Sequence, residues 1–563
     1  MRFLLMGDIH CYGHYVYDAI KKVGAPLDAI VSTGDLTNSG GQIEMESVAG
    51  AVKSGLDAIG CPDTPYIACM GNHDYGNQPH SDEENAFYRA RFESVVGVPY
   101  RHVANIKGYT FITFSARNHS AGYTNEDYDW LNQQIILAEK QSEDLPIFIV
   151  RHYSSGGASL YGDDDVVRTQ MHALLELHPR VVLLSGHSHA FLANERSFMQ
   201  SERGFHSVNA GSLWQATKWD SIPGNVSGYY IPVVIIAECE GGKVTLRRFD
   251  IAKEEYIGKP WVIAPDCDNT LDSRAKSVPA PKISGGKVLA EHIGATSVVI
   301  SYPQADEGQI EYYEAEAISE KGEAFTAKYT SHYYMPREDR GAMEMTGLYP
   351  DTAYTVTVYP VDFYGRVGEG VKGEFKTLPE NAPFDNVIFD GDIVADTWMG
   401  DTQNIRDEVG FATDSDDATP YIISKDTYNF ENGFGVFATN SRNHHNNSDT
   451  DFSCLQVGRY TAATCRTKEG NRVAILDGWQ IDDGNPFQSA NIVAEADLPY
   501  AIGQQVIGLT LFDGKLTMWR DNLPALTVDA DGESEPIKIA LRLGETWGVF
   551  KNCATFSKIK IVK

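Results

Sequence analysis

Short apolar runs alternate with segments of helical periodicity over the first 250 residues, and this alternation constrains the fold more than any other feature. The runs with the length and composition of buried strands are Phe3–Met6, Ala29–Ser32, Tyr66–Met70, Thr110–Phe114, Ile147–Val150 and Val181–Leu184, with β-rich runs at Val233–Ala237 and Val244–Phe249. The segments with helical spacing are Gln42–Ala58, Glu126–Lys140 and Val166–Leu177. We therefore predict an α/β domain in which helices cover β-sheets.

Polar motifs come directly after most of these strands. They are Gly7-Asp8-Ile9-His10, Gly34-Asp35, Gly71-Asn72-His73-Asp74, His152 after Arg151, and Gly186-His187-Ser188-His189. In open α/β sheets ligands gather at the carboxyl ends of the strands, so these loops should meet at one site. A single loop histidine, such as His14, His102 or His178, is usually a surface residue. The succession of five motifs is what predicts the site.

The side chains of these motifs have the chemistry of metal ligands. Carboxylate, imidazole and amide oxygen suit manganese, iron or zinc, and one bridging carboxylate can hold two cations about 3.5–4 Å apart. Pairs at i and i+2, as in Asp8/His10 and His187/His189, suit a chain that is leaving a strand, where both side chains can turn towards nearby metals. A glycine before each motif lets the backbone approach closely without a Cβ clash.

The charge balance argues against several classes of partner. The chain has 563 residues, a formal charge of −30 and a pI near 4.9, so its surface repels polyanions. Nucleic-acid polymers and anionic membranes are therefore not expected partners. No stretch approaches about 18 consecutive apolar residues, so no transmembrane helix is predicted. The apolar start is too short for a signal peptide and is interpreted as the first strand, so a leader is either not made or already removed.

The length predicts several domains, because one hydrophobic core does not grow to this size. We place the α/β domain at residues 1–263 and a linker rich in Pro, Asp and Ser at 264–278. Short strands and turns without helical periodicity then predict two β-sandwich domains, 279–379 and 380–563. The eight cysteines are scattered, but Cys454 and Cys465 are near enough in sequence to pair if oxidised.

The five motifs, in this order and at strand ends, resemble those of the calcineurin-like metallophosphoesterase superfamily. The likeness extends over the whole α/β domain and implies an αββα sandwich. It also implies two divalent cations, with manganese favoured and iron or zinc as alternatives. In that arrangement Asp8, His10 and His189 would hold one metal, Asn72, His152 and His187 would hold the other, and Asp35 would bridge them.

The same resemblance implies a reaction. A hydroxide held between the metals would attack phosphorus in line, because paired cations lower the pKa of bound water and neutralise charge on the phosphoryl oxygens. His73 would protonate the departing oxygen, and Asp74 would hold its imidazole in position. The expected enzyme is a metal-dependent phosphoric ester hydrolase that acts on a phosphodiester or a phosphomonoester.

Two departures from the family pattern narrow this expectation. The purple acid phosphatase branch places a metal-binding tyrosine shortly after the second motif, but Gly34–Asn38 contains none, so a redox iron site is not expected. Many relatives follow the fourth motif's histidine with His and Pro, whereas this chain has His152-Tyr153-Ser154. The motif set is also similar to that of class III cyclic-nucleotide phosphodiesterases. The motifs therefore predict the ligands and leave the substrate open.

Cues to the substrate are few. The segment Gly211–Trp219 and the pair Tyr229-Tyr230 place aromatic residues after the last motif. They could overhang the metals and stack on a base or a sugar, or they could pack a lid or a domain interface. Arg117 and Arg151 could clamp a phosphate, or they could have surface roles.

The second predicted domain resembles a fibronectin type III module. The segment Gly347–Val358 is similar to the corner of such modules, where a tyrosine, here Tyr354, bonds back to the backbone. Tyr302 stands where that family usually has Trp. The last domain looks like a laminin-G or concanavalin-type sandwich, with a hairpin signal at Asp513-Gly514. Such sandwiches often bind glycans, and a spacer without a ligand is the alternative.

Hypotheses of different classes follow. The leading one is a dimetal phosphoesterase whose sandwich domains serve attachment or targeting at an extracellular, cell-surface or virion location. The alternative is a structural or adhesion protein, such as a phage virion component, with a vestigial phosphoesterase domain. Glycan binding by the C-terminal sandwich is compatible with the leading hypothesis. The intact ligand set favours the enzyme, because a structural domain has no need to keep so many polar side chains together.

Overall fold

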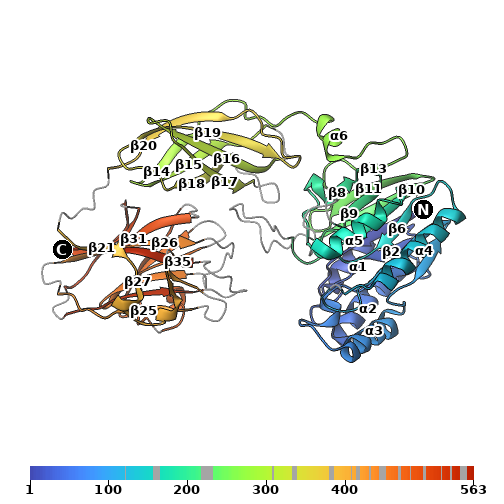
Figure 1. Ribbon diagram of the computed structural model, residues 1–563, viewed down its shortest axis with the longest axis horizontal. Coiled ribbons are helices and arrows are strands. Elements are labelled where there is room, and N and C mark those ends of the chain that lie inside the picture. The colour runs from blue at the N-terminus through green and yellow to red at the C-terminus, as the bar shows by residue number, and fades with distance from the viewer. Residues whose placement is uncertain are drawn as a thin grey trace. The chain divides into compact units, whose positions relative to one another are not determined.

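The computed structural model describes most of the chain (Figure 1). The chain divides into two compact units. Unit 1 contains residues 1–221, 226–280 and 363–366, and unit 2 contains residues 222–225, 281–362 and 367–563. The residues described are 1–120, 122–155, 165–216, 232–306, 310–331, 339–379, 386–407, 409–413, 419–429, 433–442, 452–466, 471–481, 483–498, 503–521, 523–532, 536–544 and 554–563.

Unit 1 contains two β-sheets. The first has the order β12-β11-β10-β1-β2-β3, with β13 paired to β11, and the second has the order β4-β5-β6-β7-β9-β8. The strands of the first sheet are β1 (Arg2–Met6), β2 (Ala29–Ser32), β3 (Tyr66–Ala68), β10 (Val233–Glu240), β11 (Lys243–Asp250), β12 (Glu255–Tyr256) and β13 (Trp261–Ile263). Those of the second are β4 (Val103–Ile106), β5 (Tyr109–Thr113), β6 (Ile147–Val150), β7 (Val181–Ser185), β8 (Phe198–Gln200) and β9 (His206–Asn209).

The two sheets pack face to face, and helices cover both outer faces. Strand β1 is apolar on both faces, which explains this layering. Phe3 and Leu5 point into the core between the sheets, and Leu4 and Met6 contact the helices. The first sheet is covered by α1 (Gly13–Val23), α2 (Gln42–Ala58) and α3 (Asp82–Val96), and the second by α4 (Asn125–Gln141) and α5 (Asp165–Leu175). This is the αββα arrangement that the sequence predicts.

Parallel strands direct the loops of the site to one end of the unit. Strands β1, β2 and β3 run parallel to one another, as do β5, β6, β7 and β9. The predicted motifs follow β1, β2, β3, β6 and β7, so each begins where a parallel strand ends. Of the described helices, none is long and apolar enough to cross a membrane.

Three helices of unit 1 are absent from the sequence-based prediction. Helix α3 buries only Asn85 and Phe92, so its apolar periodicity is too weak to identify it. Helix α1 begins directly after the first motif and has no side-chain N-cap. Helix α6 (Leu271–Lys276) lies in the predicted linker, where Arg274 forms an ion pair with Glu195. These contacts are why unit 1 extends to Ala280 rather than ending at residue 263.

Unit 2 begins with two small antiparallel sheets around one core. Their orders are β14-β15-β18 and β17-β16-β19-β20. The strands are β14 (Leu289–Ile293), β15 (Ser297–Pro303), β16 (Ile310–Ser319), β17 (Ala324–Thr330), β18 (Arg340–Thr346), β19 (Ala353–Asp362) and β20 (Val371–Lys376). The backbone N–H of Tyr349 donates to the Tyr354 hydroxyl over 2.7 Å, which is the corner contact expected from the sequence.

Two larger antiparallel sheets form the rest of unit 2 and enclose a second core. Their orders are β23-β24-β35-β26-β31-β32-β33, with β21 paired to β35, and β22-β25-β34-β27-β28-β29-β30. The strands are β21 (Val387–Asp392), β22 (Trp398–Gly400), β23 (Ile405–Arg406), β24 (Gly410–Ala412), β25 (Tyr421–Ser424), β26 (Phe434–Arg442), β27 (Phe452–Val457), β28 (Tyr460–Arg466), β29 (Asn471–Asp477), β30 (Ile492–Leu498), β31 (Gly503–Phe512), β32 (Lys515–Arg520), β33 (Leu523–Asp529), β34 (Ile539–Leu543) and β35 (Ala554–Val562). The region is therefore an all-β sandwich.

Two local expectations in this sandwich have opposite outcomes. Phe512 pairs with Lys515, so Asp513 and Gly514 form the two-residue hairpin turn, and both have positive φ. Cys454 and Cys465, considered as a pair if oxidised, form no disulfide in the structure, and both side chains are buried. The strand register explains this, since Cys454 lies opposite Ala463 rather than opposite Cys465.

Candidate metal centre

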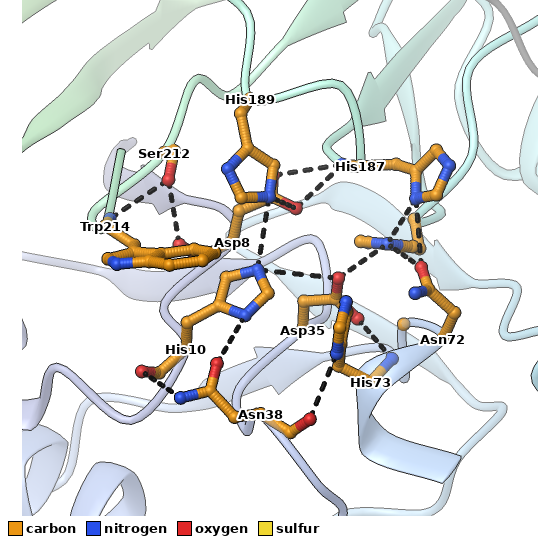
Figure 2. A network of polar contacts seen from close by, with 12 residues as sticks. Asp8, His10, Asp35, Asn38, Asn72, His73, His187, His189, Ser212 and Trp214 are labelled. Atoms are coloured by element: carbon orange, nitrogen blue, oxygen red, sulfur yellow. Dashed lines mark hydrogen bonds and ion pairs between the residues drawn. The ribbon is translucent and has the colours of Figure 1, made fainter. Parts of the chain in front are cut away.

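The side chains that the five motifs contribute meet at one end of the two sheets (Figure 2). The ligand atoms of Asp8, His10, Asp35 and His189 all lie within 4.8 Å of one another, and the same limit holds for Asp35, His152 and His187. Asp35 therefore belongs to both groups. Asn72 joins the second group, because its Oδ1 lies 2.9 Å from His187 Nδ1 and 3.0 Å from His152 Nε2.

The backbone turns sharply at these positions. Five of the candidate ligands have positive φ, namely Asp8 (48°), His10 (47°), Asp35 (50°), His187 (67°) and His189 (48°). A left-handed conformation costs a non-glycine residue about 1–3 kcal/mol. The first two loops offset this cost by bonding to each other, since the N–H groups of Ile9 and His10 both donate to the Asp35 carbonyl, over 2.8 and 3.0 Å.

Backbone and amide oxygens fix the tautomer of three imidazoles. The Nδ1 atoms lie 2.8 Å from Asn38 Oδ1 in His10, 2.9 Å from the Thr33 carbonyl in His152, and 2.9 Å from the Gln215 carbonyl in His189. Because these oxygens can only accept, each Nδ1 holds the proton and each Nε2 presents a lone pair to the centre. This is the orientation that a metal-binding histidine needs.

Burial keeps two of these imidazoles neutral. It lowers the pKa of His10 to about 4, and burial together with the charge of His10 lowers the pKa of His189 to about 3. Both are therefore neutral near pH 7 and able to donate a lone pair. For Asp35 burial opposes ionisation, but the imidazoles of His152 and His10 outweigh it and hold the pKa of Asp35 below its usual range. The carboxylate is thus available as an anionic ligand.

The donor set fits two divalent cations. The Nε2 atoms of His10 and His189 lie 3.1 Å apart, and both present lone pairs, so no hydrogen joins them. His152 Nε2 and Asn72 Oδ1 lie 3.0 Å apart, and both also present lone pairs without a hydrogen between them. A cation between such atoms would turn a repulsive contact into coordination. Asp35 Oδ2 lies 3.7 Å from His10 Nε2 and 3.2 Å from His152 Nε2, so it reaches both groups.

Asp74 departs from its expected role. Its buried carboxylate accepts from the Thr37 N–H and hydroxyl, each over 3.0 Å, and from the Gly71 N–H over 2.9 Å. It therefore holds the second and third motif loops together. The imidazole of His73 is oriented instead by Asn38, whose carbonyl lies 3.0 Å from His73 Nδ1. Burial and the charge of Asp35 raise the pKa of Asp74 to about 7.

His73 nevertheless lies at the centre. Its backbone N–H donates to Asp35 Oδ1 over 2.8 Å, and its ring centroid is 4.8 Å from that of His10. The residue begins a single 3₁₀ turn, His73–Tyr75, and its ring is only partly buried. A partly exposed imidazole at the edge of a buried polar cluster is suitably placed to meet a bound ester.

The two arginines considered as phosphate clamps have structural contacts. Arg117 Nε donates to Asp127 Oδ2 over 2.7 Å. Arg151 is fully buried, and its guanidinium donates to the Tyr123 hydroxyl and to the Ser154 carbonyl. It therefore braces the loop that carries His152 rather than lying at the surface.

Several residues of the site are absent from the sequence-based prediction. Asn38 contacts both His10 and His73, and Ser212 donates to the Asp8 carbonyl over 3.0 Å. Nothing in the sequence distinguishes them from ordinary loop residues except their closeness to the second motif and to the aromatic segment. Of that segment, Trp214 lies beside His10 and His189 in Figure 2, whereas Trp219, Tyr229 and Tyr230 fall outside the described residues.

A layered α/β unit with a buried Asp/His cluster at its strand ends is an architecture that can hold metal ions. Residues 1–191 match the family model of the calcineurin-like phosphoesterases. The N-terminal part of this chain is therefore a calcineurin-like phosphoesterase domain, followed by a large all-β sandwich region. No curated protein sequence matches the chain.

Solved structures resemble parts of the chain at low identity. Purple acid phosphatase PPD1 from yellow lupin is 12% identical over 47% of this chain and 53% of its own, with a TM-score of 0.36. A predicted phosphoesterase from Streptococcus pneumoniae is 12% identical over 46% of this chain and 96% of its own, with a TM-score of 0.24. The carbohydrate recognition domain of Emp47p is 10% identical over 33% of this chain and 99% of its own, with a TM-score of 0.26. Values this low bear on neither substrate nor ligand.

Proposed function

We propose that the protein is a dimetal-dependent phosphoesterase that hydrolyses a phosphodiester or a phosphomonoester. The observation that carries the proposal is the position of Asp35, a buried carboxylate shared by two groups of ligand atoms. Asp8, His10 and His189 would hold one cation, and Asn72, His152 and His187 the other. When bound, the cations would supply Lewis acidity to the phosphoryl group and ready a water for attack.

His73 is the residue we assign as general acid. With Nδ1 turned to the Asn38 carbonyl, Nε2 is the atom that would deliver a proton to the departing alkoxide. Asp74 supports this step indirectly, because its bonds to Thr37 and Gly71 keep the loop of His73 against the loop of Asp35. In this proposal Asp74 is a positioning residue.

Manganese is the metal we favour, with iron and zinc as alternatives. The described donor atoms of both groups are imidazole nitrogens and carboxylate or amide oxygens, without sulfur. The oxygen donors suit Mn²⁺, and the imidazoles suit iron and zinc. The β-sandwich region serves attachment or targeting in this proposal, because all nine residues assigned above belong to unit 1.

The test uses the full-length protein loaded with Mn²⁺ and two pairs of phosphate esters. The monoester pair is p-nitrophenyl phosphate and methyl phosphate, and the diester pair is p-nitrophenyl methyl phosphate and dimethyl phosphate. In each pair p-nitrophenol is the good leaving group and methanol the poor one. We expect turnover by the wild type and about 10²–10⁴-fold loss for His73→Ala, with the larger loss on the methyl leaving group because it depends more on protonation. Metal analysis should find two Mn²⁺ per chain in this variant.

Two further variants make the result specific. Asp35→Asn should lose activity together with bound metal, because the shared carboxylate loses its charge. His172→Ala on α5, outside the centre, should match the wild type. Absence of turnover on every ester by the metal-loaded protein would instead favour the structural or adhesion hypothesis.

A further inference from the structure

An aromatic surface adjoins the candidate metal centre on the side of His10 and His189. The Trp214 ring centroid lies 4.5 Å from that of His10 and 5.6 Å from that of His189. Tyr12 continues the surface, with its ring at 18° to that of Trp214 and a centroid distance of 6.5 Å. Tyr15 stacks on Tyr12 at 5.8 Å and 22°. We call Tyr12, Tyr15 and Trp214 the aromatic platform.

The loop that supports the metal ligands also fixes Trp214. Its backbone N–H donates to the Ser212 hydroxyl over 3.0 Å, and that hydroxyl donates to the Asp8 carbonyl over 3.0 Å. The next residue, Gln215, accepts from His189 Nδ1. Figure 2 shows the indole held beside the imidazoles of His10 and His189. The position of the indole relative to the centre is therefore set by the same hydrogen bonds that set the ligands.

Packing of the fold does not account for this tryptophan. Its neighbour Leu213 is fully buried in the core under the first sheet, but Trp214 itself stays partly exposed. Among the described residues, neither Trp214 nor Tyr12 belongs to a hydrophobic core cluster, whereas Tyr15 packs against the core under the first sheet. Large aromatic rings left partly exposed beside a buried polar cluster are typical of a surface that receives a ligand.

We propose that the aromatic platform binds a planar aromatic group of the substrate, so that the phosphoester carries a heteroaromatic base or an aryl ring. This inference rests on the proposed function for the position of the phosphate. Stacking of a base on an aromatic side chain would strengthen binding by about tenfold. The formal charge of −30 disfavours a polyanionic polymer as the source of that base, so the substrate class we propose is a small nucleotide-like or aryl phosphoester.

Binding of phosphonates tests the platform without turnover. Phenylphosphonate and cyclohexylphosphonate have the same charged group and rings of similar size, but only one ring is planar and aromatic. Calorimetry on the Mn²⁺-loaded full-length protein should give a preference for phenylphosphonate of about tenfold, equivalent to ~1.4 kcal/mol. Trp214→Ala should abolish the preference and Trp214→Phe should retain most of it. Trp130→Phe on α4 is the matched control and should leave the preference unchanged.

Kinetics on esters give the second readout. In Trp214→Ala the KM for benzyl phosphate and for thymidine 5′-phosphate should rise about tenfold. The KM for cyclohexylmethyl phosphate and for 2-deoxyribose 5-phosphate should stay within about twofold, as should kcat. A rise confined to benzyl phosphate would identify an aryl substrate, and one confined to the thymidine ester a nucleoside substrate.

Two outcomes would overturn the inference. The first is an equal loss of affinity for aromatic and aliphatic compounds in Trp214→Ala, which would show that Trp214 only supports His10 and His189. The second is equal affinity of the wild type for both phosphonates, which would show that the platform does not select for aromaticity. A wild type that prefers phenylphosphonate but hydrolyses none of the esters would contradict the proposed function alone.

Discussion

His206 is a buried histidine outside the candidate centre. It begins β9, its ring stacks on Phe198 at 5.9 Å and 11°, and the amide of Asn269 donates to its Nε2 over 3.3 Å. Burial lowers the pKa of His206 to about 4 from its usual 6.5. The folded state therefore resists a proton that the unfolded chain accepts, which makes stability depend on pH.

The sign of this dependence follows from the lowered pKa. The contribution of neutral His206 is fully present above pH 6.5 and is lost as pH falls towards 4, by at most ~3 kcal/mol. We expect urea unfolding to show that His206→Gln loses less stability than the wild type between pH 7 and pH 4.5, by about 2 kcal/mol. The histidines of the centre titrate in both proteins and cancel in the difference. Parallel pH profiles would contradict the assignment.

Single residues show what the sequence alone can predict about the site. Asp8, Asp35 and His187 are identifiable because each follows an apolar strand, and strand order determines where those loops meet. The orientation of His73 is not identifiable, because it depends on the main-chain carbonyl of Asn38, which carries no residue-specific signal. Asp74 was expected to orient the His73 imidazole because the two residues are adjacent in sequence.

At the level of elements, the loops after β2 and β3 are in close contact through glycine. A Cβ on Gly71 would lie 2.2 Å from Asp35 Oδ1 and 2.5 Å from the Asp35 backbone N. Backbone atoms cannot move aside as a flexible side chain can. The contact therefore requires glycine at position 71.

A pair of alanine substitutions tests this contact. Gly71→Ala should displace Asp35 and reduce metal occupancy and activity at least 100-fold, with a loss of about 1–3 kcal/mol in unfolding free energy. Gly50→Ala is the matched control, because Gly50 is exposed within α2 and its added Cβ would meet no atom within 4 Å. That variant should gain about 0.5–1 kcal/mol and keep full activity. Metal analysis, phosphate release and urea unfolding give the three readouts.

Several elements have the bounds that the sequence predicted. Helix α2 spans Gln42–Ala58, and strands β2 and β6 span Ala29–Ser32 and Ile147–Val150, all with the predicted bounds. The short strands β12 and β13 escaped prediction, because two or three residues show no alternation.

For the whole molecule, the assigned centre belongs to unit 1 alone. A protein of residues 1–280 should therefore fold and keep phosphoester turnover and bound Mn²⁺ within about twofold of the full chain, because its cores do not depend on unit 2. Residues 281–563 should show no turnover. A loss above tenfold in the shorter protein, with its circular dichroism intact, would show that residues beyond 280 contribute to the centre.

The sequence predicted the order of the domains better than their boundaries. The α/β unit and the all-β region follow from the change in periodicity, but the first unit runs past the expected boundary at 263 because Asn269 and Arg274 bond back to Gln200 and Glu195. Such contacts between distant segments have no local signal. The role of the sandwich stays a prediction, because alternation reports which residues are buried and not what the exposed ones bind.

The left-handed backbone at five candidate ligands restricts how this domain can change over evolutionary time. Asparagine tolerates that conformation as well as aspartate does, whereas threonine or glutamine would keep an oxygen donor but strain the chain. Exchange of Asp8 or Asp35 for Asn would thus remove charge from the candidate metal centre without changing the backbone of its loops. In a relative that had lost catalysis we would therefore expect Asn at one of these two positions. The present chain has Asp at both.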